Sequence, residues 1–183
     1  MGFAYALLLA VAPTAGDCAV DENRSLLLSY QEFDQDMAGG WRTLEARGCQ
    51  LAAADLVRAY RHRKQELRAS ERSNLSWHEG QLRAIAGDYD RAIPLLLGGV
   101  PENDPIDFVD YALGTVAFLQ RDLRGLKAAR SRLAATPRPA PPPSPGGDGK
   151  AQAQMNWPPN LNVLDALIRC FGKPYKLAYN CRP

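Results

Sequence analysis

Apolar residues recur at three- and four-residue intervals along most of the chain, the spacing that places them on one face of an α-helix. Val, Ile and Thr are sparse, and no segment sustains the alternation of apolar and polar residues that is typical of strands. The pattern therefore predicts an all-α fold. The expected helices cover residues 21–47, 51–68, 75–86, 89–97, 105–119, 123–135 and 161–171.

Acidic residues, glycines and prolines mark the expected ends of these helices. Asp21 precedes the first helix and Asp104 precedes the fifth, so both aspartates are candidate N-caps. The Gly39-Gly40 pair either bends the first helix or ends it. Pro94 lies inside the fourth helix and predicts that this helix is short or bent.

Residues 137–160 differ in composition from the rest of the chain, because prolines recur too densely for a regular helix. Proline runs favour the extended polyproline II conformation. We expect an exposed, mobile loop, with a proline-rich ligand for another domain as the alternative. Residues 161–183 then supply a last helix and a short tail.

The first sixteen residues have the features of a secretory signal peptide. An apolar run from Phe3 to Ala12 is followed by small residues, with Thr14 and Gly16 placed for cleavage after Gly16. No basic residue precedes the run, which departs from the usual signal and leaves a buried N-terminal helix as the alternative. The run is also shorter than the roughly 20 residues that span a bilayer. We therefore expect export without a membrane span.

The chain has four cysteines, Cys18, Cys49, Cys170 and Cys181, and an even number in an exported chain favours disulfides. Three pairings are possible, and Cys18–Cys49 with Cys170–Cys181 is the most local. Four buried thiols are the alternative. No Cys-x-x-Cys spacing occurs, so the sequence gives no support to thioredoxin-like chemistry or a zinc ribbon. These features predict a periplasmic or secreted protein.

Two segments of the chain repeat a pattern at a fixed interval. Gly80 and Gly114 are separated by the same interval as Tyr89 and Leu123. The first member of each pair lies in an expected helix–turn–helix unit from Trp77 to Leu97, and the second member lies in another from Tyr111 to Leu133. A helical hairpin that recurs at this interval, about 34 residues, resembles the tetratricopeptide repeat family. The first unit keeps the Gly87-Asp-Tyr89 turn of that family, whereas the second has Arg121 at the turn glycine.

A weaker third unit precedes these two, with Gly48 at the turn and Ala53, Val57 and Tyr60 in its second helix. The resemblance covers roughly residues 38–136 and implies a right-handed stack of antiparallel helix hairpins, an α-solenoid. Each hairpin cannot bury its apolar face alone, so several must stack. The resulting boundaries are a signal peptide at 1–16, helical repeats at 17–136, a proline-rich loop at 137–160 and a capping helix with a disulfide-bonded tail at 161–183.

The same resemblance implies a groove, because such repeats bind extended peptides along their first helices. Ala84, Ile85, Phe108 and Leu119 belong to the implied groove face. Aromatic residues at helical spacing also pack in cores, so a core role is the alternative for Trp77, Tyr111 and Phe118. The candidate peptide-binding residues are Trp41, Arg42, Asn74, Trp77, His78, Gln81, Tyr111, Thr115 and Phe118.

Charge and motifs give no support to the other main functional classes. The net charge of +2 is too small to indicate nucleic-acid binding. The two histidines and the acidic residues form no metal-ligand spacing, and no nucleotide-binding or nucleophile motif occurs. We therefore expect no metal, no cofactor and no enzymatic activity. An unrecognised enzyme would need titratable groups that converge, and His78 with Glu79 is the first place to look.

The sequence as a whole predicts an exported helical-repeat module that binds a protein or an extended peptide. Its short signal and its usage of Ala and Arg point to the bacterial envelope. A structural scaffold or assembly subunit of an envelope complex is the alternative. A scaffold predicts an exposed apolar patch on a convex face or at a terminus, whereas a peptide binder predicts exposed aromatic and amide groups in a groove.

Overall fold

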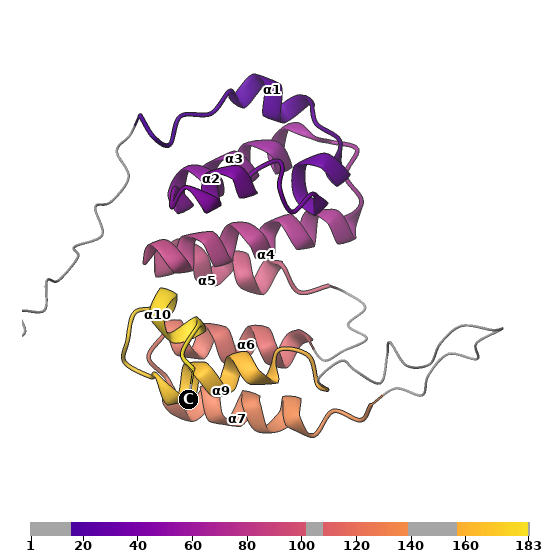
Figure 1. Cartoon of the computed structure of the whole chain (residues 1–183). Helices are drawn as coiled ribbons and strands as arrows, with labels where there is room; N and C mark the ends of the chain where they lie inside the picture. Colours follow the sequence, from indigo (N-terminus) through magenta and orange to yellow (C-terminus); the bar gives the residue numbers. More distant parts are fainter. Residues whose placement is uncertain (1–15, 102–107, 139–156, 183) are drawn as a thin grey trace, which may run out of the picture.

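The computed structural model describes residues 16–101, 108–138 and 157–182, and in these ranges the chain is helical with no strand (Figure 1). The all-α prediction is confirmed for this part of the chain. The predicted signal peptide, the candidate cap Asp104 and most of the predicted proline-rich loop lie outside the described residues. The described ends of that loop lie close together, because the Trp157 indole Nε1 donates a hydrogen bond of 2.9 Å to the Thr136 carbonyl oxygen.

The N-terminal segment differs from the single helix expected over residues 21–47. It forms α1 (Glu22–Leu27), the π-helical turn η1 (Gln31–Gln35) and α2 (Arg42–Ala46). Asp21 caps α1 as predicted, since its carboxylate accepts a 3.0 Å bond from the Arg24 amide. Gly40 has a φ of +50°, and a Cβ there would overlap the Phe33 carbonyl oxygen, so this glycine allows the chain to double back between η1 and α2.

The next three helices are α3 (Gln50–Arg63), α4 (Ala69–Ala86) and α5 (Tyr89–Gly98). The two boundaries around residue 65 were predicted wrongly: α3 ends five residues early and α4 starts six residues early. The cause is a capping interaction, in which the Arg68 amide donates a 2.9 Å bond to the Glu71 carboxylate. Pro94 lies in the middle of α5, which is a short helix, as one of the two predicted outcomes required.

The C-terminal part contains α6 (Phe108–Leu119), α7 (Leu123–Ala134), α9 (Leu161–Arg169) and α10 (Tyr175–Tyr179). Helix α9 packs against both α6 and α7, and α10 turns back to contact α4 (Figure 1). The short helix α10 was not predicted from the sequence. The tail therefore does more than cap the last hairpin, because its side chains pack against both α4 and α6.

Three helix–helix connections have the same local geometry. Gly48, Gly87 and Arg121 each have a positive φ, of 80°, 88° and 62°. The residue after each donates its amide proton to a carbonyl five positions back, at 2.8–3.0 Å. This bonding is that of the Schellman motif, which ends a helix at a left-handed residue. Arg121 thus adopts the turn conformation that glycine supplies in the two preceding connections.

Gly80 and Gly114, which hold equivalent positions in the two repeat units, both lie where helices approach closely. A Cβ on Gly80 would lie 2.9 Å from the Leu96 side chain in α5, and one on Gly114 would lie 2.7 Å from the Leu164 side chain in α9. Glycine is needed at both positions because the neighbouring helix leaves no room for a methyl group. The related residues therefore have related packing roles, although the helix that each contacts is different.

Helix α4 separates two hydrophobic clusters. One cluster contains Phe33, Leu44, Val57 and other side chains from η1 to α4, and the second contains side chains from α4 to α10. A disulfide joins the chain at each end, Cys18–Cys49 and Cys170–Cys181, so the predicted local pairing is confirmed. The first bond holds the segment before α1 against the start of α3.

Candidate functional site

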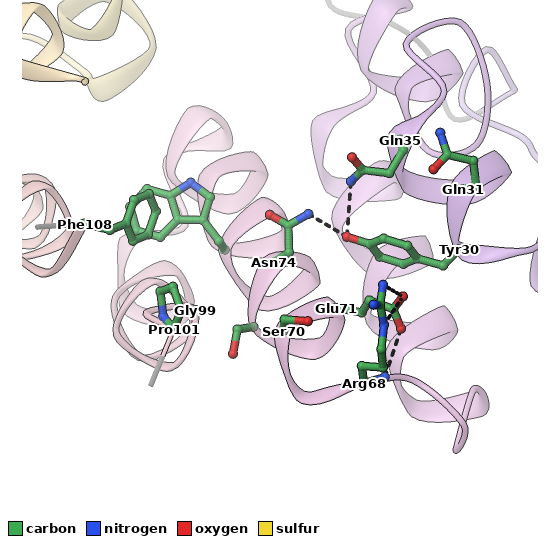
Figure 2. Close-up of a pocket in the computed structure, with 12 residues that line it drawn as sticks. Tyr30, Gln31, Gln35, Arg68, Ser70, Glu71, Asn74, Gly99, Pro101 and Phe108 are labelled. Atoms are coloured by element: carbon green, nitrogen blue, oxygen red, sulfur yellow. Dashed lines mark hydrogen bonds and ion pairs between the residues drawn. The ribbon is translucent and has the colours of Figure 1, made fainter. Parts of the chain in front are cut away.

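An open groove of about 550 Å³ lies between η1, the first half of α4, the residues Gly99 and Pro101 that follow α5, and Phe108 at the start of α6 (Figure 2). Aromatic side chains border it at both sides, with Tyr30 on one side, Phe108 on the other and Asn74 between them in the view of Figure 2. The lining residues are Tyr30, Gln31, Gln35, Arg68, Ser70, Glu71, Ser73, Asn74, Trp77, Gly99, Pro101 and Phe108.

The apolar side of the groove is a group of three packed rings. The ring centroids of Trp77 and Phe108 are 4.6 Å apart with an edge-on geometry, and both rings also contact Tyr111. Gly99 brings its backbone against Trp77, since a Cβ on Gly99 would lie 2.7 Å from the Trp77 amide nitrogen. Trp77 and Tyr111 are only 5 % and 2 % exposed, so the partly exposed Phe108, held in place by these two buried rings, provides most of the apolar surface.

The polar side of the groove is formed by an amide and a phenol that are bonded to each other. The Asn74 Nδ2 donates 2.8 Å and 2.9 Å bonds to the Tyr30 hydroxyl and to the carboxylate of Asp34. These bonds fix the amide so that its oxygen points away from Tyr30 (Figure 2). Within the described residues no donor is bonded to that oxygen, so it can accept a hydrogen bond from a guest.

The charged residues at the rim of the groove neutralise each other. The Arg68 guanidinium donates bonds of 2.9 Å and 2.6 Å to the Glu71 carboxylate. The Arg68 hydrogen bonds lower the pKa of Glu71, so the carboxylate stays ionised beside its partner. The rim therefore presents no net charge, and the groove suits a guest that is itself close to neutral.

Asp34 lies behind the polar side and is fully buried. Its carboxylate accepts bonds from Gln35 Nε2 at 2.6 Å and from the indole Nε1 of Trp41 at 2.9 Å, as well as the bond from Asn74. It also faces the Nδ1 of His78 at 2.8 Å. Burial alone would raise the pKa of Asp34, but the interactions with His78, Trp41 and Gln35 outweigh it and lower the pKa. This buried carboxylate therefore ties η1 and α2 to α4.

The predicted site residues fall into three groups. Asn74 and Trp77 line the groove, while Trp41, Arg42 and His78 surround Asp34, where an Arg42 Nη1 donates to the Asp34 backbone oxygen. The third group includes Gln81, which lines a second, smaller cavity, and three core residues. Tyr111, Thr115 and Phe118 are at most 2 % exposed and belong to the core between α6, α9 and α10.

The burial of the α6 residues has a direct physical cause. Phe118 lies 5.8 Å from the ring of Phe171 and 5.9 Å from that of Tyr175, so the C-terminal tail occupies the face implied for a peptide. The Thr115 hydroxyl donates to the Tyr111 carbonyl oxygen of its own helix at 3.0 Å. Burial raises the pKa of the Tyr111 phenol. These side chains are not presented to a guest in this structure, and Ala84 and Leu119 are buried as well.

Sequence reasoning missed most of the groove. Tyr30, Gln31 and Gln35 were expected in a long continuous helix, and the π-helical turn that aims them at α4 has no signal in the apolar spacing. Ser70 and Ser73 were missed because the start of α4 was placed at residue 75. The Gly99–Pro101 break was visible in the sequence, but its contact with Trp77 depends on the packing of α5.

His78 and Glu79 do not converge. His78 faces Asp34, whereas the Glu79 carboxylate accepts bonds from Arg61 at 2.8 Å and from Arg83 at 3.0 Å. Glu79 and Arg83 are each 2 % exposed. Burial by itself would lower the pKa of Arg83, but its bonds to Asp55 and Glu79 raise it. This second ionic network joins α3 to α4. Glu79 is therefore not available as an acid–base partner for His78.

Two other features, a metal site and a membrane-spanning helix, do not occur in the described residues. No three side chains of His, Cys, Asp or Glu in residues 16–101, 108–138 and 157–182 are grouped so that they could hold a metal ion. In the same ranges no helix is both long enough and apolar enough to cross a bilayer. Comparison of the whole chain with family models, with curated proteins and with solved structures finds no match.

Proposed function

We propose that this chain is a tetratricopeptide-like stack of helix hairpins that binds an extended peptide or protein segment in the bacterial envelope. The binding site is the groove between η1, the first half of α4, the residues Gly99 and Pro101 after α5, and Phe108. The observation that carries the proposal is the pairing of a packed aromatic surface with a fixed amide oxygen across an open space of about 550 Å³.

The repeat part of the proposal is supported by local geometry. The Gly87 and Arg121 connections are separated by the same interval as Gly80 and Gly114. Their two hydrogen bonds are matched, with Asp88 and Asp122 donating to carbonyls at 2.9 Å and 2.8 Å. An earlier connection of the same kind, with a somewhat longer spacing, begins at Gly48. Hairpins that recur in this way are what a stack of helical repeats requires.

The groove chemistry supports a peptide as the guest. An extended peptide offers backbone N–H and C=O groups along its length and side chains on alternate sides. The Asn74 amide oxygen can accept from a backbone N–H, and the hydroxyls of Ser70 and Ser73 can both donate and accept. Phe108, packed against the buried Trp77, can cover an apolar side chain, while the neutral Arg68–Glu71 rim adds no preference for a charged guest.

The location in the envelope is supported by the two disulfides. Disulfides form and persist in oxidising compartments such as the bacterial periplasm and are rare in reducing ones. A short loop closed by the Cys170–Cys181 bond also contains α10, so the bond holds in place the helix that covers α4. An exported protein that unfolds transiently in the envelope benefits from both restraints.

A second candidate function is the scaffold, and one observation favours it. Val109 and Leu113 are four residues apart in α6, so they lie on the same face, and they are 42 % and 40 % exposed. Exposed apolar residues on one helix face are typical of docking between proteins. In this case the surface of α6, and not the groove beside α4, makes the contact.

The experiment that tests the proposed function uses a bulky substitution at the exposed groove residue Ser70. Peptides that bind the wild-type protein are first selected from a random library displayed on phage. Ser70→Arg places a long side chain in the groove, so we expect a selected peptide to bind at least about tenfold more weakly. Ser131→Arg makes the same change on an exposed face of α7 and serves as the matched control.

The proposal is contradicted if no peptide is enriched or if both variants bind as tightly as wild type. Weaker binding in Leu113→Arg, with Ser70→Arg unaffected, would instead support docking through α6. Thermal unfolding of each variant shows whether the folded state is intact.

A further inference from the structure

A second cavity, of about 110 Å³, lies nearer the C-terminal end of α4, where α2 and α10 approach it. It is distinct from the peptide groove, since no residue lines both. Its walls come from three helices that are far apart in the sequence. The lining residues are Trp41, Glu45, His78, Gln81, Leu82, Ile85, Tyr175 and Tyr179.

The walls of this cavity are mainly aromatic. Tyr175 and Tyr179 have ring centroids 5.5 Å apart at an angle of 55°, and Trp41 and His78 have centroids 5.2 Å apart at 45°. The faces of Trp and Tyr rings carry negative charge density and attract cations. Trp41 already holds a cation in this way, because the Arg42 guanidinium carbon lies 4.1 Å from its ring centroid.

The charge around the cavity has the same sign as the ring faces. Glu45 lines the cavity and is partly exposed, and within the described residues no cation or hydrogen-bond donor is paired with its carboxylate. The buried Asp34 carboxylate lies behind Trp41 and His78 and is bonded to both. No Lys or Arg is among the lining residues, and His78 is the only basic one.

The cavity also has polar capacity that the fold leaves unused. The Tyr175 side chain, which lines it, is fully buried, and its hydroxyl makes no hydrogen bond of normal geometry among the described residues. Burial raises the pKa of this phenol, and the nearby Gln81 side chain opposes the shift only in part, so the hydroxyl stays protonated. A fully buried hydroxyl without a partner costs free energy, and such groups often mark a place where water or a ligand completes the structure.

We propose that this cavity binds an organic ammonium group, with Glu45 as the counter-charge and Tyr179, backed by the buried rings of Trp41 and Tyr175, as the aromatic wall. The volume limits the ligand, because a liquid water molecule occupies about 30 Å³, and 110 Å³ therefore holds a group of only a few non-hydrogen atoms. A methylated ammonium fits this limit, and a nucleotide or an extended peptide does not. The partly exposed Glu45, Gln81, Ile85 and Tyr179 form the mouth.

This site goes beyond the proposed peptide groove and does not depend on it. The peptide groove has a neutral rim and an amide as its fixed polar group, whereas the small cavity has an unpaired carboxylate and four aromatic rings. Binding at either site can therefore succeed when the other fails.

The test is a titration of the full chain with tetramethylammonium, followed by NMR. The Trp41 indole N–H is the main reporter, because it is bonded to Asp34 and its ring lines the cavity. The neutral molecule tert-butanol has a similar size and shape and is the ligand control. Glu45→Gln removes the counter-charge with little change in volume, and Glu22→Gln makes the same change on the exposed surface of α1.

We expect tetramethylammonium to give a saturable shift of the Trp41 indole signal, and tert-butanol to give none. Glu45→Gln should weaken the affinity by about tenfold or more, and Glu22→Gln should leave it unchanged. Tyr179→Leu provides a second variant, because it removes a partly exposed wall while keeping an apolar side chain, and it should also weaken binding. If the NMR spectra of both variants resemble that of the wild type away from the cavity, both variants are folded.

Two further probes separate the possible sources of the ammonium group. Choline represents a free small molecule, and an acetylated, amidated trimethyl-lysine represents the side chain of a protein. A saturable Trp41 shift with either probe supports the proposal and identifies the source. The proposal is overturned if no ammonium probe gives a saturable shift, if tert-butanol binds equally well, or if Glu45→Gln binds as tightly as Glu22→Gln.

Discussion

Helices α4 and α6 hold corresponding positions in the two predicted repeat units, yet most of their corresponding residues have different surroundings. Asn74, His78 and Gln81 on α4 are partly exposed and meet polar groups of the N-terminal segment or a small cavity. The equivalent positions of the next unit carry Phe108, Ala112 and Thr115, of which Phe108 borders the groove whereas Ala112 and Thr115 are fully buried. Two of these three positions are thus partly exposed in one unit and part of the core in the next.

The comparison shows that a repeat pattern determines which residues share a face, and that the elements around it determine what the face does. The glycines illustrate this point, because Gly80 and Gly114 both permit close packing. Gly80 admits α5 of its own hairpin, whereas the closest neighbour of Gly114 is Leu164 of α9, a helix outside the repeat. The C-terminal tail therefore determines which residues of the second predicted unit are buried.

Asp34→Ala is the change that should distinguish the two helices most strongly. It removes the acceptor shared by Trp41, Asn74 and His78, so the buried Trp41 indole N–H loses its partner and Asn74 keeps only its bond to the Tyr30 hydroxyl. We expect a loss of about 3–5 kcal/mol in the free energy of unfolding, together with loosening of η1 from α4. Chemical denaturation measures the loss. A cost below about 1 kcal/mol would mean that the N-terminal segment is not held by this carboxylate.

The Asp34 network also predicts how stability depends on pH. The pKa of Asp34 is lowered in the folded chain, so its contribution to stability is complete above the ordinary Asp value of about 4 and is lost as the pH falls through the folded pKa. The difference in unfolding free energy between wild type and Asp34→Asn should therefore shrink as the pH falls below about 4. A difference that stays constant down to pH values near 2 would contradict this account.

The two connections test the repeat itself with reciprocal substitutions. Gly87 has a φ of 88° and open space where a Cβ would lie, so Gly87→Arg should cost about 1 kcal/mol through backbone strain alone. Arg121→Gly relieves the same strain at a φ of 62° but also removes the bond from Arg121 to the Gly172 carbonyl, so its net effect should be smaller. Thermal unfolding of both variants provides the comparison. If both variants lost the same amount of stability, a glycine would bring no relief of strain at position 121, and the two connections would not be equivalent.

Thr115→Val should have the smallest effect. The hydroxyl donates to a carbonyl of its own helix, and valine fills nearly the same space in a fully buried site. We expect a change of less than about 1 kcal/mol, in contrast to the loss in Asp34→Ala. Chemical denaturation under the same conditions gives the value. A loss as large as that of Asp34→Ala would place Thr115 in a polar network like that around α4.

The sequence predicted the helical class, most of the helix boundaries after residue 69 and both disulfides. Apolar spacing and glycine positions carry that information locally, and the cysteine pairing follows from proximity along the chain. The first helix was predicted to bend or end at Gly39-Gly40, and the chain does double back there, but the earlier break between α1 and η1 has no signal in the apolar spacing. The fold of the tail onto α4 was not predictable either, since α10 has only five residues.

The candidate site was predicted in part and for understandable reasons. Asn74 and Trp77 were named because they lie on the first helix of a repeat, and they line the groove. Tyr111 and Phe118 were named by the same rule, but the rule contains nothing about the tail that buries them. Tyr30 entered the site only through the π-helical turn of η1 and its bond to Asn74, a contact between residues 44 positions apart.

The most direct test of the account follows the backbone amide signals of the protein while a library-selected peptide is added. The account predicts that the signals of Ser70, Ser73 and Asn74 shift in a saturable way, while those of Tyr111, Thr115 and Phe118 keep their positions and their protection from hydrogen exchange. Shifts centred on Tyr111, Thr115 and Phe118, with loss of their protection, would contradict it, because the peptide would then have displaced α10 and occupied the face of α6.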